Sequence, residues 1–257
     1  PFVDPAKTAM FKDERFRKAC FHALDKDSML RTEMRGMGVS VWNMVSPVLK
    51  YWHNTNVAKF PFDQAKAKAL LDEMGLKDTN GDGIREDSQG NPASFAIITN
   101  KDNKLRERLV NLIAQDLKEV GIDARPQVLE FNTLITQTAD TFTYEACLLG
   151  LSGGGIHPSL SMNVYLSSGR THLFNPQQEK PATPWEAEID KLAEQLNATL
   201  DFAEQRDIYF KVQEIFAEHC PILTLFNEYA FVAVRNKFGN LKPNVLGELI
   251  WNADEFY

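Results

Sequence analysis

The chain has 257 residues, of which 44% are apolar and 25% are charged, which is ordinary for a globular protein and enough to bury a full core. Its net charge of -7 argues against nucleic acid and anionic membranes as partners, because both attract basic surfaces. No apolar run approaches the roughly 20 residues that a membrane-spanning helix requires.

The three cysteines, Cys20, Cys147 and Cys220, lie far apart and form no CxxC pair. Their odd number and spacing are typical of neither a disulfide framework nor a zinc site. Cys20 falls in a helical pattern and Cys147 in a strand pattern. We therefore interpret the thiols as buried and inert, with one disulfide left open as the alternative.

The N-terminal part alternates irregular segments with short amphipathic helices. Residues 1–12 contain two prolines and little periodicity, which predicts a linker. Apolar residues at helical spacing then predict three helices, over 13–24, 29–34 and 64–74. Residues 39–51 show no period, and Trp42 within them is either a packed side chain or part of a binding wall.

A loop rich in Asp and Gly follows the third helix. Asp78, Asn80 and Asp82 occupy positions 1, 3 and 5 of an EF-hand-like calcium loop, and Gly83 occupies position 6. Position 12 is Gln89 instead of the bidentate Glu, and the segment downstream predicts a strand. We predict a turn without metal that leads into a hairpin, and a calcium site is the alternative.

The middle of the chain alternates strands and helices. Apolar runs predict strands over 95–99, 122–129 and 144–149, and helical stripes predict helices over 103–120 and 131–138. Strands alternating with helices in this way predict βαβ units and a mainly parallel sheet.

The strand at 144–149 runs into four glycines, Gly150 and Gly153 to Gly155, followed by Pro158. Open α/β sheets bind ligands at such strand ends, and glycine allows a close approach to the backbone. The loop is therefore either a ligand-binding loop or a tight connection without a ligand.

The last part predicts mostly helix. A short helix is expected over 161–166, and a helix pair over 185–199 and 202–219. Two strands are expected beyond it, over 221–226 and 230–234. Residues 238–257 show no clear period.

Five segments, in order along the chain, together resemble one family, the extracytoplasmic solute-binding proteins of dipeptide- and oligopeptide-type ABC importers. Residues 11–25 are similar to the family's F-x-D-x-R-x-R-x-A-x-x-x-A-x-D helix, and residues 62–75 to its Y-D-P-x-x-A-K-x-L-L-x-x-A-G helix. Residues 117–123 resemble its L-x-x-I-G-I-x-V segment. The glycine loop with Pro158 and the P-x-x-P-L-like strand at 221–225 complete the resemblance.

This resemblance implies an α/β fold, a periplasmic-binding-protein-like lobe with a mixed, mainly parallel sheet flanked by helices. Residues 1–225 would be the C-terminal ligand-binding lobe, and residues 226–257 would return toward the hinge and a first lobe that the chain lacks. The family implies a small solute or peptide as ligand, an ABC importer permease as partner, and a monomer without cofactor or enzymatic activity. It also implies a periplasmic or membrane-anchored extracytoplasmic location, as for a lipoprotein.

In peptide binders of this family, the loop after the strand carries a Trp and, three residues on, an Asp that pairs with the peptide's amino terminus. Leu151 and Gly154 stand at these two positions here. A peptide with a free amino terminus is therefore unexpected unless another acid substitutes, because a buried ammonium needs a carboxylate. The candidate ligand-binding residues are Trp42, Leu151, Ser152, Gly153, Gly154, Gly155, His157 and Asn163.

Two other classes of function remain as alternatives. The string from Gly150 to Gly154 fits the G-x-S-x-G pattern of a serine hydrolase, with Ser152 as nucleophile, and it follows a strand. No helix follows at once, however, and only His172 and His219 come later as candidate bases. A calcium-stabilised interaction module would rest on residues 78–87 alone.

Overall fold

The computed structural model describes residues 4–151 and 155–231, together with 233, 235, 237, 239–242, 244 and 251–255. The α-helices are α1 (Pro5–Lys12), α2 (Glu14–Ala23), α3 (Lys26–Glu33), α4 (Gln64–Glu73), α5 (Lys104–Lys118), α6 (Phe131–Ile135), α7 (Pro184–Ala198) and α8 (Phe202–His219). The strands are β1 (Gly38–Ser40), β2 (Ser94–Asn100), β3 (Asp123–Leu129), β4 (Ala146–Cys147) and β5 (Phe226–Glu228). A π-turn, η1 (Thr136–Asp140), and two 3₁₀ turns, η2 (Pro158–Val164) and η3 (Ala253–Glu255), complete the described elements.

Three strands form one parallel sheet in the order β3-β2-β4. Ser94 pairs with Asp123 and Asn100 with Leu129, so β2 and β3 run side by side over their full length. β4 adds only two residues beside Ile97 and Ile98. The prediction that these three segments share a sheet is confirmed, and the α/β fold class with it, although β4 is shorter than the run predicted over 144–149.

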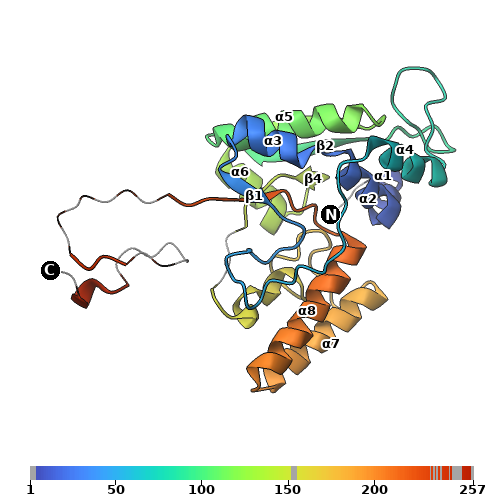
Figure 1. The fold of residues 1–257 in the computed structure, drawn as a ribbon. Helices are drawn as coiled ribbons and strands as arrows, with labels where there is room; N and C mark the ends of the chain where they lie inside the picture. Colours follow the sequence, from blue (N-terminus) through green and yellow to red (C-terminus); the bar gives the residue numbers. More distant parts are fainter. Residues whose placement is uncertain are drawn as a thin grey trace.

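The sheet core consists of apolar residues from α2, α4, α5, β2 and β3. Helix α5 contributes the stripe of Leu109, Val110, Ile113 and Leu117, and it covers the sheet as the spacing predicts (Figure 1). Gly121 lies between the end of α5 and the start of β3 and has φ +86°, a conformation that favours glycine.

The hairpin core lies between α7, α8, η2 and the irregular segment 41–57. Figure 1 shows α7 and α8 as an antiparallel pair below the sheet. Tyr165 from the end of η2 packs edge-on against Tyr209 and Phe216 of α8, with ring centroids 5.9 and 4.9 Å apart. The region predicted as one lobe, residues 1–225, thus contains two large clusters of buried side chains, and a third small one of Phe21, Phe60 and Cys220.

A clasp joins the two ends of this region. β1 pairs antiparallel with β5, so that Gly38 lies opposite Glu228. The ammonium of Lys26 donates to the carbonyls of Val41 and Thr224 at 2.7 and 3.0 Å. The guanidinium of Arg17 donates to the carbonyls of Cys220 and His219 at the end of α8.

Three predictions of secondary structure are wrong. Residues 1–12 are not a linker where described, because Asp4 caps α1 and Pro5 begins it. No strand covers 221–225, and β5 begins only at Phe226, where β1 offers a partner. Of the strand expected at 230–234, residues 230, 231 and 233 are described and lie outside any strand.

Within the described residues, no helix combines the length and the apolar character needed to cross a bilayer. The three cysteines are free thiols, with Cys20 and Cys220 buried. Burial raises the pKa of Cys147 and of Cys220 to about 12, so neither is a thiolate at neutral pH. The interpretation of the cysteines as inert thiols agrees with this placement.

Candidate functional site

The carboxyl ends of β2, β3 and β4 meet at one edge of the sheet because the strands are parallel. Pairing continues past the strands, since the Lys101 amide donates to the Leu129 carbonyl at 2.7 Å and the Thr99 hydroxyl to the Leu148 carbonyl at 3.0 Å. An ion pair between Lys101 and Glu130 joins the loops after β2 and β3. This carboxyl edge is where an open α/β sheet binds ligands.

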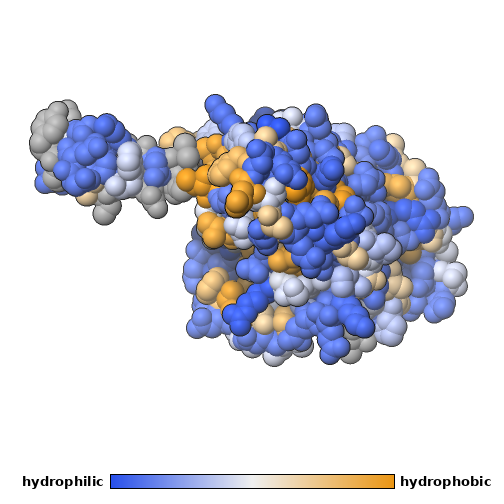
Figure 2. Space-filling model, turned by 90° about the horizontal axis from the view of Figure 1, so that it is seen from below, coloured by the Kyte–Doolittle hydropathy of each residue, from blue (hydrophilic) through white to orange (hydrophobic). Residues whose placement is uncertain are grey.

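Large apolar side chains lie exposed on the connections that leave the carboxyl edge. Their exposed fractions reach 53% for Phe131 and 58% for Ile156, and the full group is Phe131, Ile135, Leu151, Ile156 and Leu160. In Figure 2, apolar side chains gather near the point where the C-terminal segment leaves the body. A contiguous exposed apolar surface at this edge would be a candidate binding surface.

The glycine loop is described only at its two ends. Leu151 is 44% exposed, and Gly155 has φ +145° and lies so close to Leu160 that a Cβ there would come within 2.6 Å of its Cδ1. Ser152, Gly153 and Gly154 lie outside the described residues. Their predicted role as ligand contacts therefore stays a prediction.

His157 packs toward the hairpin core. Its Nδ1 lies 2.8 Å from the Ser159 hydroxyl and its Nε2 lies 3.1 Å from the side-chain oxygen of Gln205. Its ring meets Trp52 and Phe202 edge-on. Both ring nitrogens therefore already have a protein partner, and this favours a structural role for His157.

Trp42 belongs to a different cluster, beside the clasp. The ammonium of Lys26 lies 3.5 Å above its ring, and Phe21 packs beside it. Burial lowers the pKa of Lys26 to about 7. Asn163 is exposed on η2. Among the described residues, no contact joins Trp42, His157 and Asn163, so the predicted site residues do not form a single cluster.

Arg106 was missed by the sequence analysis. It lies in the first turn of α5 and donates from Nη1 to Oδ1 of Asn100, the last residue of β2, at 2.7 Å. Gly150, the first residue after Leu149 at the end of the predicted strand, lies directly under its guanidinium. Asn100 and Gly150 each come just after a predicted strand, and this position is the signal in the sequence that could have indicated the site.

The loop at 78–87 folds onto its own polar groups. Asp78 accepts from the amides of Gly81 and Gly83, and Asp82 accepts from the Ile84 amide. Ligand oxygens of Asp78, Asp82 and the buried Glu86 lie within 4.8 Å of one another. Glu86, which is 5% exposed, is the third acid of this cluster.

The Asn80 side chain turns its nitrogen toward Asp82 and Glu86 at 3.2 and 2.9 Å. A calcium ligand would have to present the amide oxygen instead. The carboxylates of Asp78 and Asp82 already accept hydrogen bonds from the backbone amides of the turn. This favours the interpretation as a turn without metal.

The two histidines of the hydrolase alternative are engaged elsewhere. His172 is fully buried and lies 3.0 Å from Oε1 of Glu186. His219 contacts Glu14 and stacks on Trp185. Burial raises the pKa of Glu186, but hydrogen bonds from His172, Gln178 and Thr183 outweigh it and lower the pKa to about 2.

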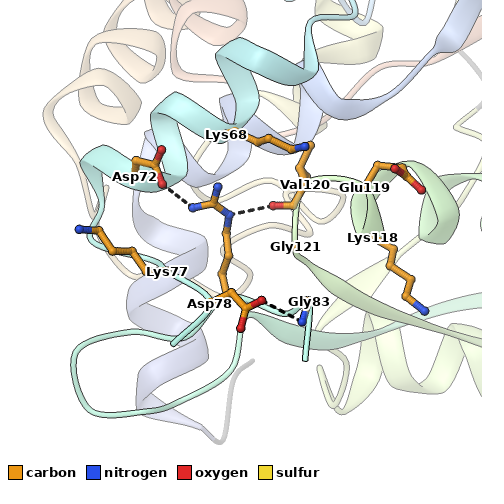
Figure 3. A pocket seen from close by; sticks show the side chains of 10 residues that line it. Lys68, Asp72, Lys77, Asp78, Gly83, Lys118, Glu119, Val120 and Gly121 are labelled. Atoms are coloured by element: carbon orange, nitrogen blue, oxygen red, sulfur yellow. Dashed lines mark hydrogen bonds and ion pairs between the residues drawn. The ribbon is translucent and has the colours of Figure 1, made fainter. Parts of the chain in front are cut away.

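A pocket of about 350 Å³ lies at the opposite end of the sheet, next to Gly121 before β3 (Figure 3). The guanidinium of Arg85 donates to Asp72 at 2.6 Å and to the Val120 carbonyl at 2.9 Å, as the dashed lines show. Lys68, Lys77 and Lys118 lie at its rim. These bonds fasten the loop before β2 to α4 and α5, so we assign the pocket a structural role.

The sequence model of the family described as bacterial extracellular solute-binding proteins, family 5 Middle, matches residues 5–172. A probable ABC transporter-binding protein of Deinococcus radiodurans is 30% identical over 230 residues, which cover 85% of this chain and 39% of the relative. The oligopeptide-binding protein AppA of Bacillus subtilis is 30% identical over 226 residues, covering 86% of this chain and 39% of AppA.

The solved structure of that AppA in complex with a nonapeptide is similar with a TM-score of 0.82 and 26% identity, over 97% of this chain and 48% of that chain. The chain therefore spans about two fifths of the length of the curated relatives it matches.

Proposed function

Because the chain belongs to family 5 of the bacterial extracellular solute-binding proteins, we propose that it is one lobe of a two-lobe receptor that binds a solute and delivers it to an ABC importer. The observation that carries this proposal is the carboxyl edge. Exposed apolar side chains, an arginine without an ion pair among the described residues, and the described ends of the glycine loop lie there at the ends of parallel strands.

The lobe would comprise residues 1–225, and residues 226–257 would lead back toward the hinge and the other lobe. The clasp supports this division, since β5 pairs with β1 beside the buried Lys26 and the chain leaves the region there. Closure of two lobes over a ligand would exclude water from the carboxyl edge. Such a receptor binds without chemistry, so we expect no enzymatic activity and no cofactor.

The ligand would be a peptide or another small solute, bound at the carboxyl edge by residues 150–156. AppA of Bacillus subtilis was solved with a nonapeptide, which supports an extended ligand. The partner would be the membrane permease of an ABC importer, and the receptor would act as a monomer outside the cytoplasm, tethered as a lipoprotein. The negative net charge supports the proposal that nucleic acid is not a partner.

The glycine loop can be tested in the full two-lobe protein with Gly154→Asp. This variant places a carboxylate where the family's peptide binders pair with the ligand's amino terminus. We expect it to bind a dipeptide at least about tenfold more tightly than the N-acetylated dipeptide, because an ion pair shielded from water becomes available. Isothermal titration calorimetry with both peptides measures the ratio.

Ser168→Asp, an exposed position of the next connection, is the matched control and should leave the ratio unchanged. If Gly154→Asp leaves both affinities as they were, and substitutions across 152–157 change no binding, the glycine loop is not the ligand site.

A further inference from the structure

Arg106 lies half-buried beside the carboxyl ends of β2 and β4. One end of its guanidinium is held by Asn100. The other end lies against Gly150, where an added Cβ would come within 2.5 Å of Nη2. The absence of a side chain at residue 150 therefore leaves the space that the guanidinium fills.

Among the described residues, Arg106 differs from its cationic neighbours because it has no carboxylate partner. Lys101 forms an ion pair with Glu130, and Lys104 forms one with Glu107. No ion pair of Arg106 exists within the part of the chain that the structure describes. Its bond to Asn100 uses only one of the N–H donors of the guanidinium.

From Ala146 to Gln178 the chain contains no Asp and no Glu, so the residues of the glycine loop that are not described offer no carboxylate either. The acids at the carboxyl edge are Glu107 and Glu130, already paired, and the exposed Asp102 in the turn before α5. Within the described residues and the glycine loop, the edge thus carries a cation that no carboxylate neutralises.

We propose that Arg106 binds a carboxylate of the solute, and that the preferred solutes carry such a group and need no free amine. This rests on the proposed function and names the ligand class for that site. A guanidinium remains charged and presents N–H donors in a planar fork that fits the two oxygens of a carboxylate. Removal of water on closure would strengthen this pair, whereas an ammonium would find no acid in the glycine loop.

The test uses two matched pairs of probes and the full two-lobe protein. One pair is N-acetyl-alanyl-phenylalanine and its C-terminal amide, and the other is trigalacturonate and neutral galactotriose. We expect the acid of one pair to bind at least about tenfold more tightly than its neutral partner in calorimetry. The pair that shows the difference tells whether the carboxylate comes from a peptide or a sugar.

Arg106→Gln keeps a donor for Asn100 but removes the charge. It should weaken binding of the acid by about tenfold or more and leave the neutral probe unchanged. Arg108→Gln is the matched control, because Arg108 lies exposed on the same helix and pairs with Glu33. It should change neither affinity.

Equal binding of acid and neutral probes by the unaltered protein would overturn the inference and leave the proposed function in place. Equal weakening of both probes by Arg106→Gln would overturn it too, since Arg106 would then only support the fold. Binding of neither pair would also end it, and the Gly154→Asp experiment would decide the proposed function separately.

Discussion

The sheet core and the hairpin core bury side chains in the same chain but satisfy their polar groups in different ways. Around the sheet core, the strands pair their own backbone along the full length of β2 and β3. Around the hairpin core, the irregular segments 41–57 and 157–183 have no such ladder. Their backbone groups bond instead to buried side chains, such as Gln213 of α8.

Buried polar side chains occur on both sides of the molecule, but those on the hairpin side bond to irregular backbone segments. The hairpin side holds Asn43, Asn54, Ser167, His172, Glu186, Gln205 and Gln213. A buried polar group that loses its partner costs more free energy than a typical hydrogen bond gains. We infer that the hairpin core depends on a few polar residues, while the sheet core depends on apolar volume.

The largest effect is expected for Glu186→Ala. Glu186 is 1% exposed and bonds to His172, Gln178 and Thr183. Removing one partner of a buried pair should lower the free energy of unfolding by about 4 kcal/mol. Urea denaturation followed by circular dichroism measures it, and the exposed Glu188→Ala should change it by less than about 0.5 kcal/mol. Equal losses in both variants would contradict the comparison.

Gln213→Leu should come next. Its side chain accepts from the Asn54 amide at 3.0 Å and donates to the Trp52 carbonyl at 2.8 Å. Leucine keeps the volume but leaves these groups unpaired, so we expect a loss of about 2 kcal/mol in the same denaturation experiment. Gln195→Leu on the exposed face of α7 is the control. A Gln213→Leu variant as stable as the parent would show that segment 41–57 is held by packing alone.

Acid should weaken the hairpin core. The pKa of Glu186 is lowered to about 2 from an ordinary value of 4.5. A carboxyl with a depressed pKa contributes stability that is present above pH 4.5 and is lost as pH falls toward 2. The stability difference between the parent and Glu186→Gln should therefore shrink over that range. Urea denaturation at pH 6, 4 and 3 measures it, and a constant difference would refute the assignment.

In the sheet core, Ile97→Val should cost about 1 kcal/mol, because it removes one buried methylene from the middle of β2. Thermal denaturation monitored in the far ultraviolet checks it. A loss as large as that of Gln213→Leu would erase the proposed distinction between the two cores.

The smallest effect is expected for calcium. The carboxylates of Asp78 and Asp82 already accept backbone amides of the turn, much as side chains do around the hairpin core. Millimolar calcium should leave the melting temperature of the chain unchanged, and Asp78→Ala should not alter that result. Micromolar binding in calorimetry that Asp78→Ala abolishes would instead establish a metal site.

The sequence predicts best the elements whose formation depends on residues close together in the chain. Helix α5 could be placed from its apolar stripe and from Gly121, because both signals lie within the helix and its end. β1 and β5 could not be placed, since each becomes a strand only through its distant partner. For the same reason Arg106 could not be predicted as a site residue, because its position at the carboxyl edge depends on its contact with the distant Gly150. The described ends of the predicted glycine loop follow β4 at the carboxyl edge, whereas Trp42 and His157 pack elsewhere.

The clasp has a consequence for the order in which the protein can assemble. The guanidinium of Arg17 bonds to a carbonyl 203 residues away in the sequence, and the ammonium of Lys26 to one 198 residues away. These two bonds can form only after nearly the whole chain has been synthesised. Contacts of such long range close slowly. On a ribosome, α2 and α3 would emerge long before their partners exist. In a nascent chain that stops before α8 ends, Lys26 could bond only to Val41 and Arg17 only to carbonyls of its own N-terminal segment. The clasp would therefore form only at the end of synthesis.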